Sequence, residues 1–141
     1  MAKQPLTATI SETGDSAFAV SIDVSGHQLI GDEPVDAGGG NLGPAPMDLL
    51  TAALGECTAM TIRWVARQKN WPLEHVAVTV TQRKGGEGAS SPRQDVFEKT
   101  IVLKAPGLSA EQQQELIAAA AKCPIQRTLE GTPLIRTAAQ T

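Results

Sequence analysis

The sequence predicts an α+β fold, and three observations support this prediction. The N-terminal third alternates apolar and polar residues, as short antiparallel strands do. A long apolar stretch with helical spacing follows at 46–69, and later segments return to strand and then helix patterns. The 141 residues are 41% apolar and 19% charged, with no internal repeat or linker, so we expect a single domain over residues 1–141.

The N-terminal segment is predicted to form a three-stranded antiparallel meander. Residues 7–12 and 17–25 alternate, and Thr13-Gly14-Asp15 between them has the composition of a turn. Ser25-Gly26 then allows a short third strand at 27–30.

The central helix is predicted to run from Pro46 to Lys69, with Cys57 near its middle. Proline suits the first helical position, and Asn70 ahead of a tryptophan and a proline supplies a stop. Because the helix is apolar on nearly every side, we expect two layers of the chain or a second subunit to cover it. The side that carries Cys57 should face a core, since most residues three, four or seven positions away are apolar: Leu50, Ala53, Leu54, Met60, Thr61 and Trp64.

The connection before this helix, residues 31–46, is rich in glycine and proline. Residues 38–43 match the pattern G-x-G-x-x-G, but no hydrophobic strand precedes them and two prolines follow, so a dinucleotide site is rejected. We expect a mobile loop at the rim of the cysteine helix.

The second half is predicted to hold further antiparallel strands and a second helix. Residues 76–81 and 96–104 have strand patterns, and a capping box at 109–112 opens a helix that ends near Lys122. A final short strand is expected at 134–137.

Cys123 is expected at the N-cap of a short helix over 124–129, because proline at 124 ends one helix and suits the start of the next. A thiol at this position has a lowered pKa. Arg127 lies one turn further on. A structural disulfide is not expected in a reducing compartment, so these residues alone leave two readings, a redox-active pair and two inert core thiols.

Composition and charge exclude several function classes. A net charge of −3 without a basic, aromatic cluster argues against nucleic acid as a partner. Charged residues within the helix argue against a membrane span, and no apolar leader is present, so a cytoplasmic location is expected. His27 and His75 are isolated, so no metal site is expected. No cofactor is expected either.

With both cysteine segments in view, the chain resembles the OsmC/Ohr family, the osmotically induced and organic hydroperoxide resistance proteins. The likeness covers nearly the whole chain in order. Its central motifs are Gly43–Leu50 (GPAPMDLL), Ala52–Leu54, Cys57–Thr61 (CTAMT) and Lys122–Leu129 (KCPIQRTL), and Gly26-His27 and Asp32-Glu33-Pro34 resemble one OsmC-like subgroup.

The resemblance implies an OsmC-like fold that forms an intertwined homodimer, with two long cysteine helices wrapped by sheets from both chains. The active sites would lie at the interface. Characterised family members are thiol peroxidases that reduce organic hydroperoxides. By this resemblance Cys57 is the peroxidatic cysteine and Cys123 the resolving one, joined as a disulfide that an external dithiol reduces.

The sequence departs from the family pattern in two places. The pattern has a thiolate-stabilising arginine in the N-terminal region, whereas the first arginine here is Arg63. It also has a glutamate at the start of the cysteine helix, where this chain has Met47. The candidates to replace this pair are Arg127 and then His27 as the activating residue, and Asp48 or Glu33 as the orienting residue.

Two functions follow. The first is a peroxidase for a small or apolar organic hydroperoxide, with Leu50, Met60 and Trp64 as the apolar walls of the substrate pocket. The second is an OsmC-like dimer without efficient turnover that serves as a thiol redox sensor or binds a small ligand.

Overall fold

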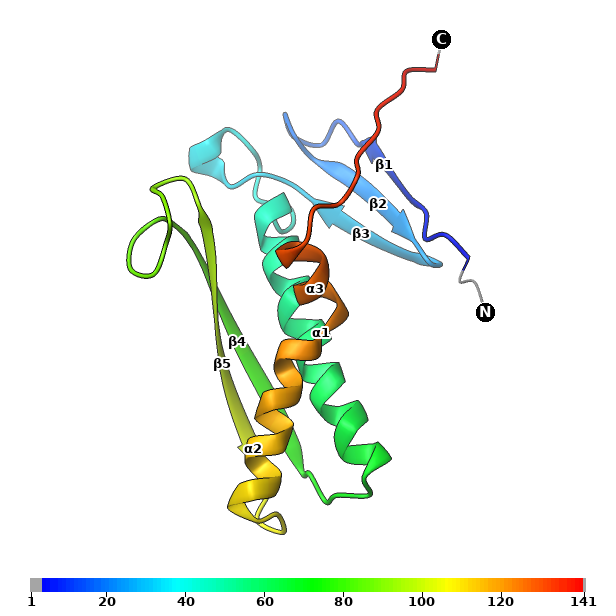
Figure 1. Cartoon of the computed structure of the whole chain (residues 1–141). Coiled ribbons are helices and arrows are strands. Elements are labelled where there is room, and N and C mark those ends of the chain that lie inside the picture. Colours follow the sequence, from blue (N-terminus) through cyan, green and yellow to red (C-terminus); the bar gives the residue numbers. More distant parts are fainter. Residues whose placement is uncertain (1–3, 141) are drawn as a thin grey trace. The chain divides into compact units, whose positions relative to one another are not determined.

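The computed structural model describes residues 4–140 and confirms the predicted α+β fold (Figure 1). Its helices and strands, in chain order, are β1 (Ala8–Glu12), β2 (Val20–Val24), β3 (His27–Gly31), the 3₁₀ helix η1 (Val35–Ala37), α1 (Pro46–Gln68), β4 (His75–Lys84), β5 (Asp95–Lys104), α2 (Ala110–Ala119), the 3₁₀ helix η2 (Ala120–Lys122) and α3 (Pro124–Glu130).

The chain divides into two compact units, the first ending at Leu50 and the second beginning at Thr51. Helix α1 starts in the first unit and continues through the second. The predicted single domain over 1–141 includes four residues, 1–3 and 141, that lie outside the described range. That domain assignment therefore stays a prediction.

The first unit contains the predicted three-stranded antiparallel meander, in the order β1-β2-β3. Ile22 on the central strand lies opposite Ile10 on one side and Leu29 on the other. Strand β2 begins at Val20, later than predicted. The residues before it form a longer connection, in which the Ser16 hydroxyl donates hydrogen bonds to a distant carboxylate at 2.9 Å.

That carboxylate belongs to Asp32, which is only 3% exposed. It also accepts backbone N–H bonds from Glu33 (2.7 Å), Gly40 (3.1 Å) and Leu42 (3.2 Å). The glycine-rich loop is therefore folded around one buried anion. The sequence pattern that formally matched a nucleotide loop supplies part of this cradle, since Gly40 belongs to it.

In the second unit, the β4–β5 hairpin runs beside α1, and α2 belongs to the same unit (Figure 1). Gly55 permits a close approach between α1 and the hairpin, because a Cβ there would lie 3.2 Å from the Val80 side chain. The buried core of this unit consists of residues from α1, the connections, α2 and η2: Ile62, Ala66, Leu73, Ala105, Leu108, Leu116 and Ala120.

The buried side of α1 differs from the predicted one. Within the chain, the buried stripe consists of Leu54, Thr58, Ile62 and Ala66. The stripe through Cys57 was expected to face a core, but Met60 and Trp64 on it are 63% and 62% exposed. One chain covers a single face of a helix that is apolar on nearly every side.

The predicted helix boundaries largely hold. Helix α1 ends at Gln68, and Asn70 adopts the left-handed conformation (φ 55°) that the sequence signal required. Ser109 and Gln112 form the predicted capping box at the start of α2. Among residues 4–140, no helix is long and apolar enough to span a lipid bilayer.

The predicted strand at 134–137 is wrong. Residues 132–140 form no strand, and Leu134 and Ile135 are 77% and 82% exposed. An alternating pattern becomes a strand only where another strand pairs with it. No described strand pairs with this segment.

Candidate active site

The candidate site lies in the second unit, where α1 and α3 bring the two cysteines together. Cys57 on α1 is partly buried, Cys123 is fully buried, and both thiols are free. The two thiols lie close enough for each to shift the pKa of the other. Sequence separation gave no reason to pair them, so this contact is the main structural finding about the site.

The local sequence explains the position of Cys123. Helix α2 gives way to η2 at Ala120, and Cys123 leaves the helical conformation (φ −57°, ψ 128°). Pro124 then occupies the first position of α3, as predicted. Cys123 is the N-cap, and its Sγ accepts the backbone N–H of Gln126 at 3.5 Å.

Two threonines of α1 complete the surroundings of the thiols. The Thr61 hydroxyl lowers the pKa of Cys57, and the Thr58 hydroxyl, which donates to the Leu54 carbonyl oxygen at 2.8 Å, lowers the pKa of Cys123. The backbone of Ile125 hydrogen-bonds to both sulfur atoms. Each sulfur therefore has one hydroxyl neighbour and at least one backbone N–H neighbour.

The environment moves the two thiol pKa values in opposite directions. Burial, and then the hydrogen bond to Cys123, raise the pKa of the Cys57 thiol. Burial also opposes ionisation of Cys123, but hydrogen bonds from Cys57, Gln126 and Thr58 outweigh it and lower the pKa of the Cys123 thiol. Of the two thiols, Cys123 is therefore the one that ionises more readily in the reduced protein.

Lys99 of β5 is the cation that reaches this cluster. Its Nζ donates to Thr58 Oγ1 at 3.1 Å, to the carbonyl oxygen of Ala120 at 3.0 Å and to Gln126 Oε1 at 2.6 Å. One ammonium group therefore donates hydrogen bonds to α1, η2 and α3, the three elements around the thiols. Lys99 was not among the candidates chosen from the sequence.

The sequence does carry a signal for Lys99. In β5 the inward-facing positions are Phe97, Lys99, Ile101 and Leu103, all partly buried, and they alternate with exposed residues over 98–104. A lysine in the apolar phase of a strand needs a buried partner or an exit to solvent.

The four sequence candidates for activating or orienting the thiol have the following local surroundings. Arg127 is exposed, and its guanidinium makes no hydrogen bond or ion pair with any residue from 4 to 140, although its backbone N–H donates to the Cys123 carbonyl at 3.1 Å. Asp48 accepts the Ala45 N–H at 2.9 Å at the start of α1. His27 is exposed on β3, and the Glu33 carbonyl accepts the Asn41 N–H at 3.0 Å in the glycine-rich loop.

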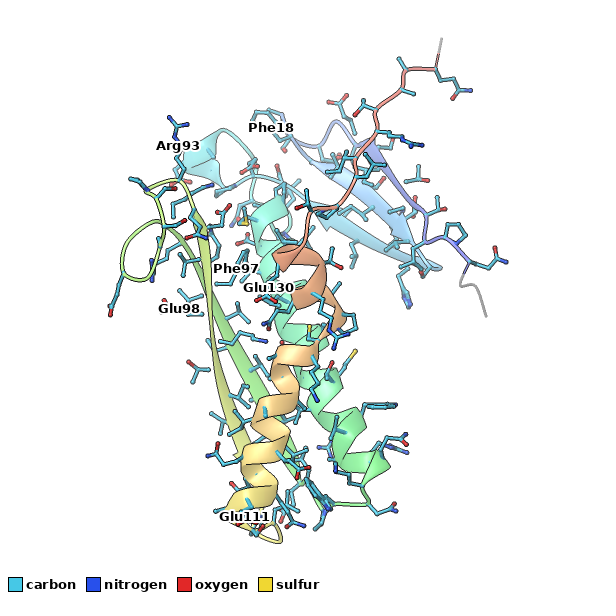
Figure 2. All side chains as sticks on the ribbon, viewed as in Figure 1. Phe18, Arg93, Phe97, Glu98, Glu111 and Glu130 are labelled. Atoms are coloured by element: carbon cyan, nitrogen blue, oxygen red, sulfur yellow. The ribbon has the colours of Figure 1, made fainter. Side chains whose placement is uncertain are left out.

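The predicted pocket residues are exposed on α1: Leu50 (37%), Met60 (63%) and Trp64 (62%). A separate cavity of about 490 Å³ lies beside Lys99 and Gln126. Phe97 of β5 and Glu130 of α3 also line it, and both are labelled in Figure 2. None of the three predicted pocket residues lines this cavity.

Metal-binding side chains do not gather here. Over residues 4–140, no group of three or more histidine, cysteine, aspartate or glutamate side chains is placed to hold a metal ion.

The fold is that of OsmC-like proteins, as solved structures show. An OsmC-like protein from Mycoplasma pneumoniae matches with a TM-score of 0.74 and 20% identity, over 92% of this chain and 90% of that chain. An organic hydroperoxide resistance protein OsmC from Legionella pneumophila matches with a TM-score of 0.61 and 21% identity, over 93% of both chains. An organic hydroperoxide resistance protein from Elizabethkingia anophelis has a TM-score of 0.66 and 19% identity, over 92% and 91%.

The sequence itself gives the family. Residues 38–138, which hold both cysteines, match the family model for OsmC-like proteins, and the chain belongs to this family. No curated protein sequence gives a significant match.

Proposed function

We propose that the protein is a Cys-based thiol peroxidase that reduces organic hydroperoxides through Cys57 and Cys123. The observation that carries this proposal is that two free thiols, one on α1 and one at the N-cap of α3, lie close enough for each to shift the pKa of the other. Membership of the OsmC-like family supports it, as do structural neighbours named as organic hydroperoxide resistance proteins.

The proposed cycle balances without a metal or cofactor. The Cys57 thiolate attacks the terminal oxygen of ROOH, the O–O bond breaks, and the products are Cys57 sulfenic acid and RO⁻, which takes up a proton to become ROH. The Cys123 sulfur then attacks the sulfenic sulfur, forming a disulfide and releasing water. An external dithiol reduces that disulfide and is itself oxidised.

Exposure favours Cys57 as the sulfur that meets the peroxide. Cys57 is partly buried, whereas Cys123 has no exposed surface. The opposed pKa directions then give Cys123 a second task, because its thiolate can accept the Cys57 proton as the peroxide is attacked. That proton leaves with the sulfenic hydroxyl as water when the disulfide forms.

A homodimer with active sites at its interface is part of the proposal. The Met60 and Trp64 side chains stand exposed on the same stripe of α1 as Cys57, and exposed apolar stripes of this kind mark interaction surfaces. Together with Leu50, they are proposed to line the approach of an apolar hydroperoxide. The cytoplasmic location stays a prediction.

The test adds one equivalent of cumene hydroperoxide to the reduced protein. We expect both thiols to be consumed and peptide mapping to find a Cys57–Cys123 disulfide. Cys57→Ser should abolish peroxide consumption, whereas Cys123→Ser should allow one oxidation and block turnover. Free thiols that persist after stoichiometric peroxide would contradict the proposal.

The raised pKa of Cys57 favours a second function, since a protonated thiol reacts slowly. In that case the dimer senses oxidants or binds a small ligand without efficient turnover. Stopped-flow assays with dihydrolipoamide and with a thioredoxin-type dithiol separate the two. Sustained multiple turnovers support the peroxidase, and a single oxidation under every dithiol supports the sensor.

A further inference from the structure

Lys99 is an unusual residue for its position. It occupies the inward phase of β5, and its Nζ reaches three acceptors that are all neutral: a hydroxyl, a backbone carbonyl and a side-chain amide oxygen. The ammonium group has three N–H donors, so this set satisfies its hydrogen bonds but leaves its charge unbalanced.

No carboxylate among residues 4–140 lies within 4.0 Å of the Lys99 ammonium. Two acidic residues line the neighbouring cavity, but each is engaged elsewhere. Asp95 pairs with Lys84 at 3.2 Å, and Glu130 accepts the Gln126 side-chain N–H at 3.3 Å. A partly buried cation without a counterion is costly, and an anion nearby offsets the cost.

The thiol pair is the group beside Lys99 that can supply this anion. The link is the Thr58 hydroxyl, which accepts from Lys99 and has one hydrogen of its own. In the structure this hydrogen is donated to the Leu54 carbonyl oxygen at 2.8 Å, and a Cys123 thiolate is the second acceptor, since the Thr58 hydroxyl lowers the pKa of Cys123. Donation from the ammonium polarises the hydroxyl, so it becomes a stronger donor to a thiolate.

We propose that Lys99 is a positioning residue for the thiol pair: through Thr58, its ammonium stabilises a thiolate of the pair when one forms. Lys99 does not touch a sulfur atom by any hydrogen bond in the structure, so its effect is electrostatic and passes through the hydroxyl. The inference deepens the proposed function, since it concerns the same thiols, but it can be tested without peroxide.

The charged and titratable groups that face this cluster come from each packed element. They are Cys57 on α1, Lys99 and Asp95 on β5, and Cys123 and Glu130 at the two ends of α3. The two carboxylates are engaged as described above, and neither hydrogen-bonds to a sulfur atom. Lys99 is the cation of this set.

The test is a pH titration of the reduced protein that follows the ultraviolet absorbance of thiolate. The chain contains no tyrosine, so tyrosinate does not overlap the signal. We expect Lys99→Met to raise the midpoint of the first thiolate by about one pH unit, which lowers the thiolate population at neutral pH about tenfold. The matched control is Lys104→Met, which removes the same charge from the same strand where the lysine is exposed and pairs with Glu74 at 3.6 Å.

Two substitutions at position 58 separate a relay from a general structural effect. Thr58→Ser keeps the hydroxyl and should keep the wild-type midpoint, whereas Thr58→Val keeps the shape and should raise the midpoint as Lys99→Met does. The combined Lys99→Met, Thr58→Val variant should show little further change, since both act on one path. Equal midpoints for Lys99→Met and Lys104→Met, or an unchanged midpoint in Thr58→Val, would overturn the proposal.

The outcome is distinguishable from failure of the proposed function. If peroxide forms no disulfide but the titration midpoint depends on Lys99, the peroxidase proposal fails and the role of Lys99 stands. If peroxide forms the disulfide but the thiolate titration midpoint is unchanged in Lys99→Met, only the Lys99 proposal fails.

Discussion

Asp32 in the first unit and Lys99 in the second are both buried or partly buried charges surrounded by neutral partners, but they differ in what those partners do. The donors to Asp32 come from the loop that surrounds it and from Ser16, so its charge organises the backbone. The acceptors of Lys99 leave its charge unbalanced beside the thiols. The charge of Asp32 therefore has a structural role in folding the loop. The charge of Lys99 has no such role, so we look for one in the chemistry of the thiols.

The largest expected effect is a loss of folding stability when Asp32 is replaced. Asp32→Asn replaces one acceptor oxygen by a donor, and at least one N–H of the cradle then loses its partner. We expect this variant to be the least stable of those considered, with loss of hydrogen-exchange protection at the Gly40 and Leu42 amides. Asp36→Asn is the matched control, because Asp36 is an exposed acid of the same loop. Equal unfolding midpoints for Asp32→Asn and Asp36→Asn would contradict a structural role for the Asp32 charge.

Low pH should also remove the contribution of the Asp32 carboxylate to folding stability, because it protonates the group. Burial alone raises the pKa of Asp32, but hydrogen bonds from Leu42, Ser16, Glu33 and Gly40 outweigh it and lower the pKa from 3.8. A carboxyl with a lowered folded pKa stabilises the fold above its ordinary pKa, and this contribution disappears as pH falls through the folded value. The stability difference between the wild type and Asp32→Asn should be constant above about pH 5 and should shrink below about pH 4. A difference that persists at the lowest pH would show that ionisation of Asp32 contributes nothing.

A smaller loss of stability is expected at Thr58, whose hydroxyl bonds both to Lys99 and to the backbone of α1. Thr58→Val removes the acceptor of one Lys99 N–H and the hydrogen bond to the Leu54 carbonyl. We expect a loss of about 1–2 kcal/mol in the free energy of unfolding, measured by urea denaturation. Thr58→Ser should lie within about 0.5 kcal/mol of the wild type. If serine costs as much as valine, the methyl group rather than the hydroxyl matters.

At Lys99 itself we expect a smaller loss of stability than in Thr58→Val. Replacing a poorly compensated cation by an apolar side chain of similar length is often neutral, so Lys99→Met should change the free energy of unfolding by less than about 1 kcal/mol. Urea denaturation of the reduced protein at neutral pH measures this change. The comparison therefore predicts opposite outcomes: Asp32→Asn loses stability with a normal thiolate titration, and Lys99→Met keeps stability with an altered one.

The sequence predicts those parts of the fold that depend on local signals. The stop at Asn70, the capping box at Ser109 and the N-cap at Cys123 each depend on neighbouring residues, and the structure has all three. The strand expected at 134–137 fails because a strand depends on a distant partner, which the pattern does not supply.

The same distinction applies to the site. Cys57 and Cys123 are visible as residues, but their proximity depends on how α1 and α3 meet, which a separation of 66 positions in the sequence does not reveal. Lys99 reaches Thr58 from a strand 41 residues away, and the role of Asp32 requires Ser16 at a separation of 16. Family resemblance directed attention to arginine and glutamate, whereas the cation in contact with the cluster is a lysine on another strand.

The most direct test of the account asks which sulfur the peroxide oxidises. Reduced Cys123→Ser and Cys57→Ser variants are treated with cumene hydroperoxide in the presence of dimedone, which traps sulfenic acid, and the adduct is mapped by mass spectrometry. The account predicts an adduct on Cys57 in the first variant and no adduct on Cys123 in the second. An adduct on Cys123, or none in either variant, would contradict it.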